Sequence, residues 1–457
     1  MAAPRVIVVG AGPAGIRAAQ ALVRAGLRPL LVDEGELDGG RIYARRAAPL
    51  AIDPQELYGA DAAAAQSVHT AFDALRAQVD LRTGVLAWNH VPGRLYVARD
   101  GRSETLEYDA LIVCAGATDR LLPIAGWQHA GTYSLGGAQL ALKTQSCAIG
   151  RRVAFVGTGP LLYLVASQYA KAGAGVAGVF DTSRWSLRLG ALPRLLANWR
   201  LLLRGAGLER ALRSGGVPLH RGITPRAIEG DAEGGVSGFT WRDADGRERR
   251  VDCDAVALGF HLRPEAQLAD LARCAFEWHA PTHQWRPRID ADGRSTVRGV
   301  YLAGDGARLR GAAAAEASGE LAALAALQDL GIATDGAAMA SLRARLVQLQ
   351  RFADGIAAAF PWPAPLAAGI ADDTLVCRCE SITAGELRRA CREGGAREAN
   401  RAKAFSRVGM GRCQGRYCGE AAAEIIAAAG GTTCDVVGRL RAQAPVKPLG
   451  AATEATP

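Results

Sequence analysis

The chain opens with the stretch that most restricts its fold, RVIVVGAGPAGIRAAQALVRAGLRPLLVDE at residues 5–34. An apolar run enters a turn of the form G-x-G-x-x-G, apolar residues then recur at helical spacing, and a second apolar run ends on two carboxylates. The order strand, turn, helix, strand is typical of a βαβ unit that holds a dinucleotide. We therefore expect an α/β protein with a parallel sheet around this unit.

Each position of the glycine turn has a physical role in such a unit. Gly10 permits the tight turn, Gly12 lets the backbone approach a pyrophosphate, and Gly15 lets the helix pack closely on the strand. Pro13 and Ala14, which lie between Gly12 and Gly15, are the first residues of the expected helix. The helix N-terminus offers free amide groups and the positive end of its dipole to the phosphates. These five residues are the expected phosphate-binding part of the site.

Carboxylates at the ends of two strands indicate which dinucleotide binds. Asp33 lies 23 residues after Gly10, the usual interval for the acid that binds ribose hydroxyls, and is favoured over its neighbour Glu34. Farther along, the string GVYLAGDGARLRG ends a strand at Gly304 and Asp305. The ribityl chain of FAD needs a hydrogen-bond acceptor, and Asp305 is suited to that role. We therefore expect FAD in this site, with capping of the following helix as the alternative role of Asp305.

A second strand-turn-helix pattern, RVAFVGTGPLLYLVASQYAKAGAGVAGVFD, occupies residues 152–181. Gly157 and Gly159 are in place and Asp181 ends the second strand, but Leu162 stands at the third glycine position. A leucine there pushes the helix away from the strand and crowds the path of a pyrophosphate. The pattern predicts the fold of an NAD(P)-binding domain and leaves open whether the site takes NAD(P), ATP or no nucleotide.

Six of the ten cysteines fall in the last 81 residues, which indicates metal or redox use rather than a disulfide framework. Four of them form two motifs, C-x-C at Cys377 and Cys379 and C-x4-C at Cys413 and Cys418, with 33 residues between the motifs. Thiolates one residue apart can both bind one iron, and the second pair can bind the other, which suits a [2Fe-2S] cluster. Zinc held by four thiolates and inert cysteines are the alternatives.

The other cysteines give no redox pair beside a flavin. Cys114, Cys147, Cys253 and Cys274 are isolated in the sequence, so thiol-disulfide chemistry has no nucleophile pair to use. No residue set suited to removing hydride from an amine appears either, and no catalytic residue is assigned. The cluster is therefore the one expected redox partner of the flavin within the chain.

The formal charge of +9 comes almost wholly from scattered arginines, without the basic run and interleaved aromatics of a nucleic-acid surface. We therefore expect no nucleic acid as a partner. Residues 186–213 mix leucines with arginines; they could dock a partner subunit or an anionic membrane face, or simply cover the nucleotide domain as two helices. We expect a cytoplasmic protein, peripheral at the inner membrane face if that stretch binds lipid.

These patterns together resemble the two-dinucleotide-domain flavoproteins of the glutathione and thioredoxin reductase superfamily. The strings VCRCESIT and MGRCQGRYC resemble the bacterioferritin-associated-ferredoxin type of [2Fe-2S] domain. The resemblance implies an FAD domain that is split by an inserted nucleotide domain and followed by a small helical cluster domain. The expected boundaries are 1–118 and 255–340 for the FAD domain, 119–254 for the NAD-like insert, 341–372 for a linker, 373–440 for the cluster domain and 441–457 for a flexible tail.

The strings GGRIYAR, GGAQLALKTQ and GTGPLLYLVA, in this domain order, resemble the large FAD subunit of opine oxidases, D-hydroxyproline dehydrogenase and hydrogen cyanide synthase. This resemblance implies flavin contacts at Gly40, Arg41 and Gly116. Arg41 stands where the family usually has glutamine, which could alter contacts near the isoalloxazine.

The same resemblance implies an electron-transfer subunit with FAD and [2Fe-2S]. In that family the amino or imino acid is oxidised on a separate flavin subunit related to glycine and D-amino acid oxidases, and a small ferredoxin-like subunit is a further expected partner. Three alternatives stay open: an NAD(P)H-dependent reductase, a subunit of a glycine-oxidising hydrogen cyanide synthase, and a non-catalytic scaffold.

Overall fold

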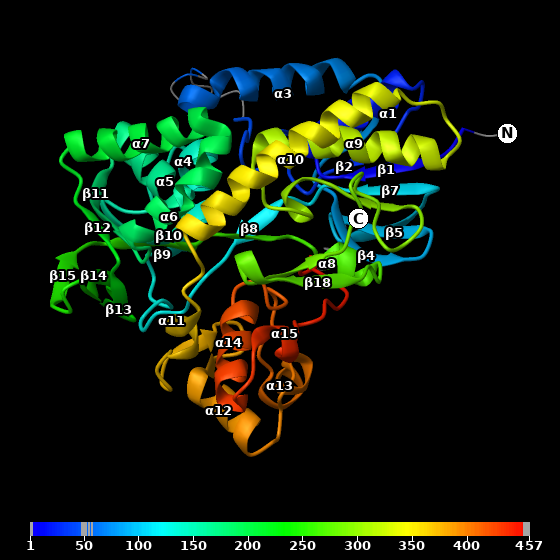
Figure 1. The fold of residues 1–457 in the computed structure, drawn as a ribbon. Helices are drawn as coiled ribbons and strands as arrows, with labels where there is room; N and C mark the ends of the chain where they lie inside the picture. Colours follow the sequence, from blue (N-terminus) through cyan, green and yellow to red (C-terminus); the bar gives the residue numbers. More distant parts are fainter. Residues whose placement is uncertain (1–2, 47–52, 54, 56–57, 451–457) are drawn as a thin grey trace, which may run out of the picture.

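The framework of the protein is two five-stranded parallel sheets (Figure 1), seen in a computed structural model that describes residues 3–46, 53, 55 and 58–450. The first sheet has the order β20-β7-β1-β2-β3 and the second the matching order β9-β16-β10-β11-β12. The first consists of β1 (Val6–Val9), β2 (Leu30–Val32), β3 (Asp80–Arg82), β7 (Ala110–Val113) and β20 (Val300–Leu302). The second consists of β9 (Thr132–Ser134), β10 (Arg152–Thr158), β11 (Gly175–Asp181), β12 (Leu219–Arg221) and β16 (Ala255–Phe260). The expected α/β class with two dinucleotide-type domains is confirmed.

The first sheet is covered on both faces. Helices α1 (Pro13–Arg24), α3 (Ala62–Leu75) and α9 (Ala312–Asp329) pack on one face around a core rich in alanine. Small residues let α1 and α9 approach closely, since a Cβ on Gly319 would lie 2.0 Å from the carbonyl oxygen of Ala14. The other face packs against α8 (Gln267–Leu271) and an antiparallel sheet of β4 (Leu86–Val91), β5 (Arg94–Arg99) and β6 (Arg102–Glu107). Buried on both faces, the parallel strands are nearly all apolar.

The inserted domain repeats this plan. Its sheet is covered by α4 (Leu135–Gln145), α5 (Pro160–Lys171), α6 (Trp185–Leu195), η3 (Leu196–Asn198) and α7 (Trp199–Ser214) on one face, and by β13 (Thr224–Asp231), β14 (Gly235–Arg242) and β15 (Glu248–Asp252) on the other. The chain passes between the domains on two paired antiparallel strands, β8 (Ala117–Asp119) and β17 (Leu262–Pro264). Because β16 pairs with β10, the insert runs to Phe260, and the expected boundary at residue 254 is wrong.

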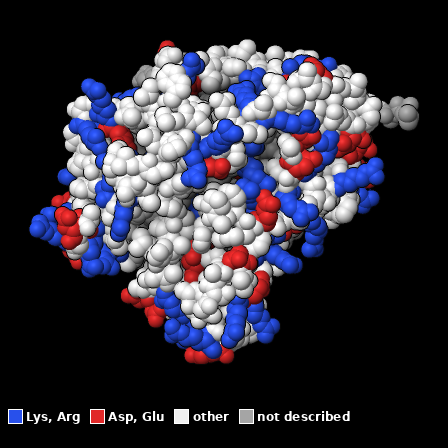
Figure 2. Space-filling view, in the orientation of Figure 1, with Lys and Arg blue, Asp and Glu red and all other residues white. Residues whose placement is uncertain are grey.

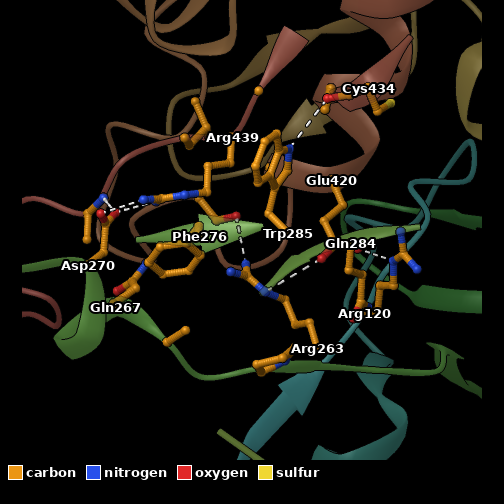
Figure 3. A pocket seen from close by; sticks show the side chains of 18 of the residues that line it. Arg120, Arg263, Gln267, Asp270, Phe276, Gln284, Trp285, Glu420, Cys434 and Arg439 are labelled. Carbon is orange, nitrogen blue, oxygen red and sulfur yellow. Dashed lines mark hydrogen bonds and ion pairs between the residues drawn. The ribbon is translucent and has the colours of Figure 1, made fainter. Parts of the chain in front are cut away.

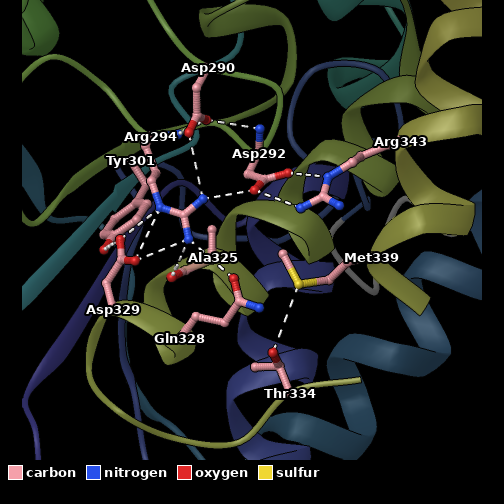
Figure 4. Close-up of polar contacts among 10 residues, drawn as sticks. All are labelled: Asp290, Asp292, Arg294, Tyr301, Ala325, Gln328, Asp329, Thr334, Met339 and Arg343. Carbon is pink, nitrogen blue, oxygen red and sulfur yellow. Dashed lines mark hydrogen bonds and ion pairs between the residues drawn. The ribbon is translucent and has the colours of Figure 1, made fainter. Parts of the chain in front are cut away.

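Helix α10 (Gly336–Ala359) lies where we expected a linker from residue 341 (Figure 1). It packs on α9 in the first domain and on α6 in the insert, so it is in contact with both domains. Figure 4 shows the arginine network near its start, in which Arg343 and Arg294 both bind the buried Asp292, at 2.6 and 2.7 Å. The expected linker is therefore helical for most of its length.

The cluster domain is small and helical and lies below the two sheets in Figure 1. It consists of α11 (Ala364–Ala368), α12 (Ala384–Arg392), α13 (Ala399–Ser406), α14 (Gly419–Gly430), α15 (Cys434–Val437) and a hairpin of β21 (Leu375–Cys377) and β22 (Ile382–Thr383). Its apolar core is continuous with the core of the insert, where the Trp127 indole nitrogen donates to the carbonyl oxygen of Leu375 at 2.6 Å. The expected small helical domain is present.

Residues 441–450 are not the flexible tail that we expected. Val446 is 2% exposed, and its amide donates to the carbonyl oxygen of Trp88 at 3.1 Å, so the segment packs on the first domain. Residues 451–457 lie outside the described part of the chain. The remaining short elements are η2 (Gly59–Asp61), β18 (Phe276–His279), η4 (Ala280–Thr282), β19 (Gln284–Pro287) and η5 (Gly304–Gly306). Within the described ranges, no helix has the length and apolar character needed to cross a membrane.

Candidate functional site

The first glycine turn opens onto a cavity of about 640 Å³, which is large enough for a cofactor. Gly10 has a φ of +106°, and a Cβ on it would lie 2.4 Å from the carbonyl oxygen of Cys114. A Cβ on Gly15 would lie 1.7 Å from the carbonyl oxygen of Gly10, so neither position accepts a side chain. Helix α1 begins without a side-chain cap, which leaves its first amides for an anionic ligand. The turn therefore fits a pyrophosphate.

All the residues expected to bind FAD, except Gly15, line this cavity. Gly15 lies under the turn, where α1 meets the strand. The lining residues from that prediction are Gly10, Gly12, Pro13, Ala14, Asp33, Glu34, Gly40, Arg41, Gly116, Gly304 and Asp305. Segments from both parts of the split domain thus meet around one space.

Asp33 and Glu34 have different environments. Asp33 is partly buried, and its two oxygens accept hydrogen bonds from the amides of Ala11 and Gly35, at 2.5 and 2.6 Å. Burial nonetheless raises the pKa of this carboxyl group. The Glu34 side chain is 48% exposed and ion-paired with Lys447. The geometry therefore favours Asp33 as the residue that shapes the turn and Glu34 as the carboxylate available to a ligand, the reverse of the order we expected.

Asp305 lies at the cavity wall and holds the loop that precedes α9. One of its oxygens accepts hydrogen bonds from the amides of Arg310 and Gly311, at 2.9 and 3.1 Å, and Gly311 is the residue that caps α9. Asp305 also lines the cavity. Burial raises the pKa of its carboxyl group. Across the cavity the backbone of Gly40 approaches that of Gly12, and a Cβ on Gly40 would lie 3.0 Å from the Gly12 Cα.

Seven charged residues that line the same cavity were missed by sequence reasoning, namely Glu36, Asp38, Arg45, Asp119, Glu265, Arg416 and Lys447. Three of them come from segments far from the glycine turn. Glu265 follows β17, Arg416 comes from the cluster motif, and Lys447 comes from the segment that we expected to be flexible. Arg416 was placed only near the cluster by its position in the string RCQGRYC. No local pattern indicated that it also reaches the flavin cavity.

The second glycine turn faces the protein's own side chains. A Cβ on Gly157 would lie 1.6 Å from the carbonyl oxygen of Gly259, and a Cβ on Gly159 would lie 3.4 Å from the His261 ring. Leu162 is fully buried in the core of the insert. The turn thus keeps the backbone shape of a nucleotide site while a histidine lies against it.

Asp181, the expected ribose acceptor of the second site, has no exposed surface. One of its oxygens accepts from the Tyr163 hydroxyl and from Arg188, each at 2.7 Å, and the other accepts from the amide of Ser183 at 2.8 Å. A buried carboxylate is stable only when it is paired in this way. Its hydrogen-bonding capacity is therefore used inside the protein.

The segment that joins α10 to the cluster domain lies over the same turn. The carbonyl oxygen of Phe360 is 2.5 Å from His261 Nε2, and the Arg188 guanidinium carbon is 4.6 Å from the centre of the Phe360 ring. Gly157, Gly159 and Asp181, the residues expected to hold a second nucleotide, are thus adjacent to this segment and to Arg188. The arrangement does not favour a bound nucleotide.

The four expected metal-binding cysteines converge. The Cys377 thiol is in hydrogen-bonding contact with Cys418, Cys379 with Cys413, and Cys413 with Cys418. The thiol contacts of Cys377 and Cys379 thus run to the second motif, so the two motifs form one group of sulfurs. The Cys418 thiol and backbone amides lower the pKa of Cys377 to about 6, as suits a thiolate ligand.

The four cysteine sulfurs form a donor set that suits a [2Fe-2S] cluster. Within the described residues, the group of three metal-ligating atoms that all lie within 4.8 Å of one another is His283, Glu424 and Cys434, which lies outside the two cysteine motifs.

Glycines and amides surround the cysteines. A Cβ on Gly411 would lie 2.2 Å from the Cys379 Cβ, so the loop can pass there only as glycine. Amides of Gly409 and Glu380 donate to the Cys377 sulfur, and an amide of Gly415 donates to Cys413. Such hydrogen bonds stabilise the negative charge of a cluster.

The cluster loop is docked on the FAD domain by buried polar contacts (Figure 3). Arg120, 2% exposed, forms an ion pair with Glu420, and its guanidinium carbon lies 3.8 Å from the centre of the Trp362 ring. The Gln267 amide nitrogen donates to the carbonyl oxygen of Gln414 at 2.8 Å. Desolvation lowers the pKa of Arg120. Removing either partner of such a buried pair is costly, so the domain is fixed in position.

Comparisons with known proteins agree with this architecture. Residues 4–320 match the family described as pyridine nucleotide-disulphide oxidoreductase, and residues 375–428 match the BFD-like [2Fe-2S] binding domain. The chain is 34% identical to an opine oxidase subunit of Agrobacterium tumefaciens, over 97% of this chain and 90% of the relative. It is 30% identical to the HcnB subunit of hydrogen cyanide synthase from Pseudomonas aeruginosa, over 97% of each chain.

A solved structure shares the whole fold. L-proline dehydrogenase from P. horikoshii superposes with a TM-score of 0.70 at 17% identity, over 99% of this chain and 79% of that one. The donor sets fit the cofactors that the two matched domains imply, FAD and a [2Fe-2S] cluster. The chain therefore belongs to the pyridine nucleotide-disulphide oxidoreductase family, as an FAD- and [2Fe-2S]-containing oxidoreductase subunit similar to its counterpart in opine oxidase.

Proposed function

We propose that this chain is the electron-transfer subunit of a heteromeric amino or imino acid dehydrogenase or oxidase, of the D-hydroxyproline dehydrogenase or opine oxidase type. The substrate is oxidised on a separate flavin subunit. The main support for this proposal is that the two expected cofactor sites share a residue. Arg416 lines the FAD cavity and also lies in the chain between the expected cluster ligands Cys413 and Cys418. The names of the relatives, which are subunits of larger enzymes, support a multi-subunit complex.

Within this function, FAD lies with its pyrophosphate on the turn at Gly10 and Gly12. Glu34 binds the ribose, because the oxygens of Asp33 are engaged by backbone amides. Asp305 is the acceptor for the ribityl chain. Gly40, Arg41 and Gly116, which also line the cavity, would contact the flavin part of the cofactor.

The second candidate is a subunit of a glycine-oxidising enzyme of the hydrogen cyanide synthase type. It is supported by the 30% identity to HcnB, which extends over 97% of both chains. An NAD(P)H-dependent reductase is less well supported. At the second glycine turn, Asp181 is bound by Arg188, and the His261 ring lies against Gly159.

The partners follow from the same proposal. A flavin subunit like glycine or D-amino acid oxidase carries the substrate pocket, and a small ferredoxin-like subunit is a further partner. The identity of the flavin subunit fixes the substrate, so the decisive experiment is to purify this chain with its native partners and mix the complex anaerobically with candidate substrates. We expect the flavin of this chain to bleach with an imino or amino acid when the partner is present. Bleaching by NADPH alone, in the isolated chain, would overturn the proposal.

We further propose that α6, η3 and α7 bind the partner or the anionic inner face of the membrane. Eight large apolar side chains between Trp185 and Leu203 are exposed, among them Leu189 at 57% and Trp199 at 56%. Figure 2 shows blue basic side chains spaced over pale surface on the side of the molecule where α7 lies in Figure 1. Leucine and tryptophan next to arginine suit an anionic lipid surface. Flotation with phosphatidylglycerol vesicles, and with phosphatidylcholine vesicles as the control, tests the membrane; a double Leu189→Ser, Leu203→Ser variant should lose binding.

A further inference from the structure

Arg416 lies at the boundary between the two cofactor sites. It is 8% exposed, its Nη1 donates to the carbonyl oxygen of the cluster ligand Cys413 at 3.2 Å, and it lines the FAD cavity. The same Nη1 donates to the carbonyl oxygen of Val446 at 2.5 Å, so the C-terminal segment holds the side chain in place. One residue thus touches the ligand loop and the flavin cavity together.

Glu265 fixes the other end of this connection. Arg416 Nε donates to one Glu265 oxygen at 2.7 Å and Nη2 donates to the other at 3.0 Å, the two-bond geometry that orients a guanidinium most firmly. The amide of Glu265 donates to the carbonyl oxygen of Gly116, a residue of the cavity wall, at 3.0 Å. A continuous path of bonds and hydrogen bonds therefore runs from Cys413 through Arg416 and Glu265 to Gly116.

The strand before Glu265 adds a second contact between the cluster loop and the wall of the FAD cavity. Arg263 Nη1 donates to the carbonyl oxygen of Arg416 at 3.0 Å, and Figure 3 shows Arg263 beneath the cluster loop. Strand β17, which carries Arg263, pairs with β8, which directly follows Gly116. The flavin wall and the ligand loop are thus joined through one short antiparallel pair, so their separation is fixed rather than variable.

We propose that Arg416, oriented by Glu265, is the positioning residue that couples the FAD to the [2Fe-2S] cluster. It acts in two ways, as the hydrogen-bonded route between the cofactors and as a positive charge close to both. When bound, the reduced FAD would supply two electrons, one at a time, and would release its proton to solvent. The cluster would accept one electron at a time, and an external one-electron acceptor would reoxidise it between the two transfers. The inference rests on the proposed electron-transfer function, but not on any particular substrate.

A charge near a redox centre shifts its potential in a direction that depends on the sign of the charge. Replacement of Arg416 by glutamine removes a positive charge and should make the cluster and the flavin harder to reduce. Replacement of Glu265 by glutamine removes the counter-charge and should make both easier to reduce. A merely structural role predicts no such opposite pair of shifts.

The test uses the full chain loaded with FAD and cluster. Redox titration followed by visible absorbance for the flavin and by electron paramagnetic resonance for the cluster gives the two midpoint potentials. Rapid photoreduction of the flavin by a deazaflavin radical gives the rate of transfer to the cluster. For Arg416→Gln we expect a rate at least tenfold lower, with both potentials more negative; for Glu265→Gln we expect both potentials more positive. Arg416→Lys should keep the potentials near the wild-type values while losing part of the rate.

Arg412→Gln is the matched control, because Arg412 is an exposed arginine of the same loop. It should change neither the rate nor the potentials. If Arg416→Gln retains both cofactors with wild-type rate and potentials, the inference is wrong while the electron-transfer function stands. If the wild-type chain itself shows no transfer between flavin and cluster, the proposed function fails as well. Should Arg416→Gln not assemble, the lysine and Glu265 variants still decide, since unchanged potentials in Glu265→Gln would also refute the coupling.

Discussion

The two glycine turns of this protein stand in sheets of the same strand order, but their surroundings differ. The first presents Gly10 and Gly12 to a space of about 640 Å³. At the second, Gly159 faces the His261 ring, and the segment at Phe360 lies over it. The backbone plan is thus common to both, and the side chains that border each turn decide whether a nucleotide can bind.

The carboxylates at the ends of the two strands show the same contrast. Both oxygens of Asp33 accept hydrogen bonds from backbone amides, and its neighbour Glu34 is exposed at the cavity. Both oxygens of Asp181 are engaged inside the protein, by Tyr163, Arg188 and a backbone amide, and the next residue along the chain is a threonine. The second turn therefore has no exposed carboxylate at the position that corresponds to Glu34.

The largest expected difference between the two turns comes from the third glycine position. Gly15→Val should abolish FAD binding and unfold much of the first domain, because even a Cβ would overlap the carbonyl oxygen of Gly10 at 1.7 Å. Flavin absorbance per chain and the thermal melting temperature measure both effects. Gly207→Ala, in an open stretch of α7, is the control; it should leave the flavin content unchanged and raise the melting temperature slightly, because alanine favours a helix more than glycine does. A Gly15→Val protein that keeps stoichiometric FAD would contradict the assignment of this turn.

At the matching position of the second turn, the side chain is part of the core. Leu162→Ala should lower the free energy of unfolding by about 2–5 kcal/mol, the usual cost of such a truncation, without creating a site for NADH. Urea titration and fluorescence titration with NADH provide the two measurements. Leu192→Ala, at an exposed position of α6, should change the free energy of unfolding by less than about 0.5 kcal/mol. Micromolar NADH binding in the wild type or in Leu162→Ala would show that the second turn is open after all.

The contrast between the turns could be predicted from the sequence only in part. The glycine patterns and apolar runs predicted both sheets, and the cysteine spacing predicted the cluster, because each depends on residues close together in the chain. Phe360 and Arg188 reach the second turn from distant segments, and no local pattern indicates such contacts. The apolar, proline-containing stretch near Pro361 suggested a linker, although the residues just before it continue α10. Spacing alone does not show which of Asp33 and Glu34 accepts hydrogen bonds from the backbone amides, because that depends on the path of the neighbouring turns.

Substitution of either carboxylate of the first site, Asp33 or Glu34, should have a smaller effect than the changes at the third glycine position. Asparagine at position 33 has one acceptor oxygen in place of two, so Asp33→Asn should leave a backbone amide unpaired and cost about 1–3 kcal/mol of stability. Glu34→Gln should leave stability unchanged and weaken FAD about tenfold, the loss of one charge-assisted hydrogen bond. Isothermal titration of FAD into the apoprotein and urea unfolding separate the two. If Asp33→Asn weakens FAD with no loss of stability, Asp33 is the ribose ligand, as its spacing suggested.

The smallest effect concerns pH and the histidine at the second turn. Burial lowers the pKa of His261 to about 4, so the folded protein keeps this ring neutral while the unfolded chain takes up a proton near pH 6.5. The unfolded state then binds more protons than the folded state between about pH 6.5 and 4, so stability falls as the pH is lowered through this window. His261→Gln keeps a donor for the carbonyl oxygen of Phe360 but cannot titrate. Its melting temperature should therefore decline less steeply than that of the wild type between pH 6.5 and 4.5.

The comparison of these two pH profiles isolates the second turn. His90 in the first domain also has its pKa lowered by burial, but it is present in both proteins and cancels in the difference. Parallel curves would mean that His261 takes up a proton as readily in the folded protein as in the unfolded chain, and that its ring is therefore in contact with water. A hydrated His261 would imply that the segment at Phe360 leaves the turn accessible. The turn would then be closed by this segment only some of the time, and a nucleotide could compete with Phe360 for it.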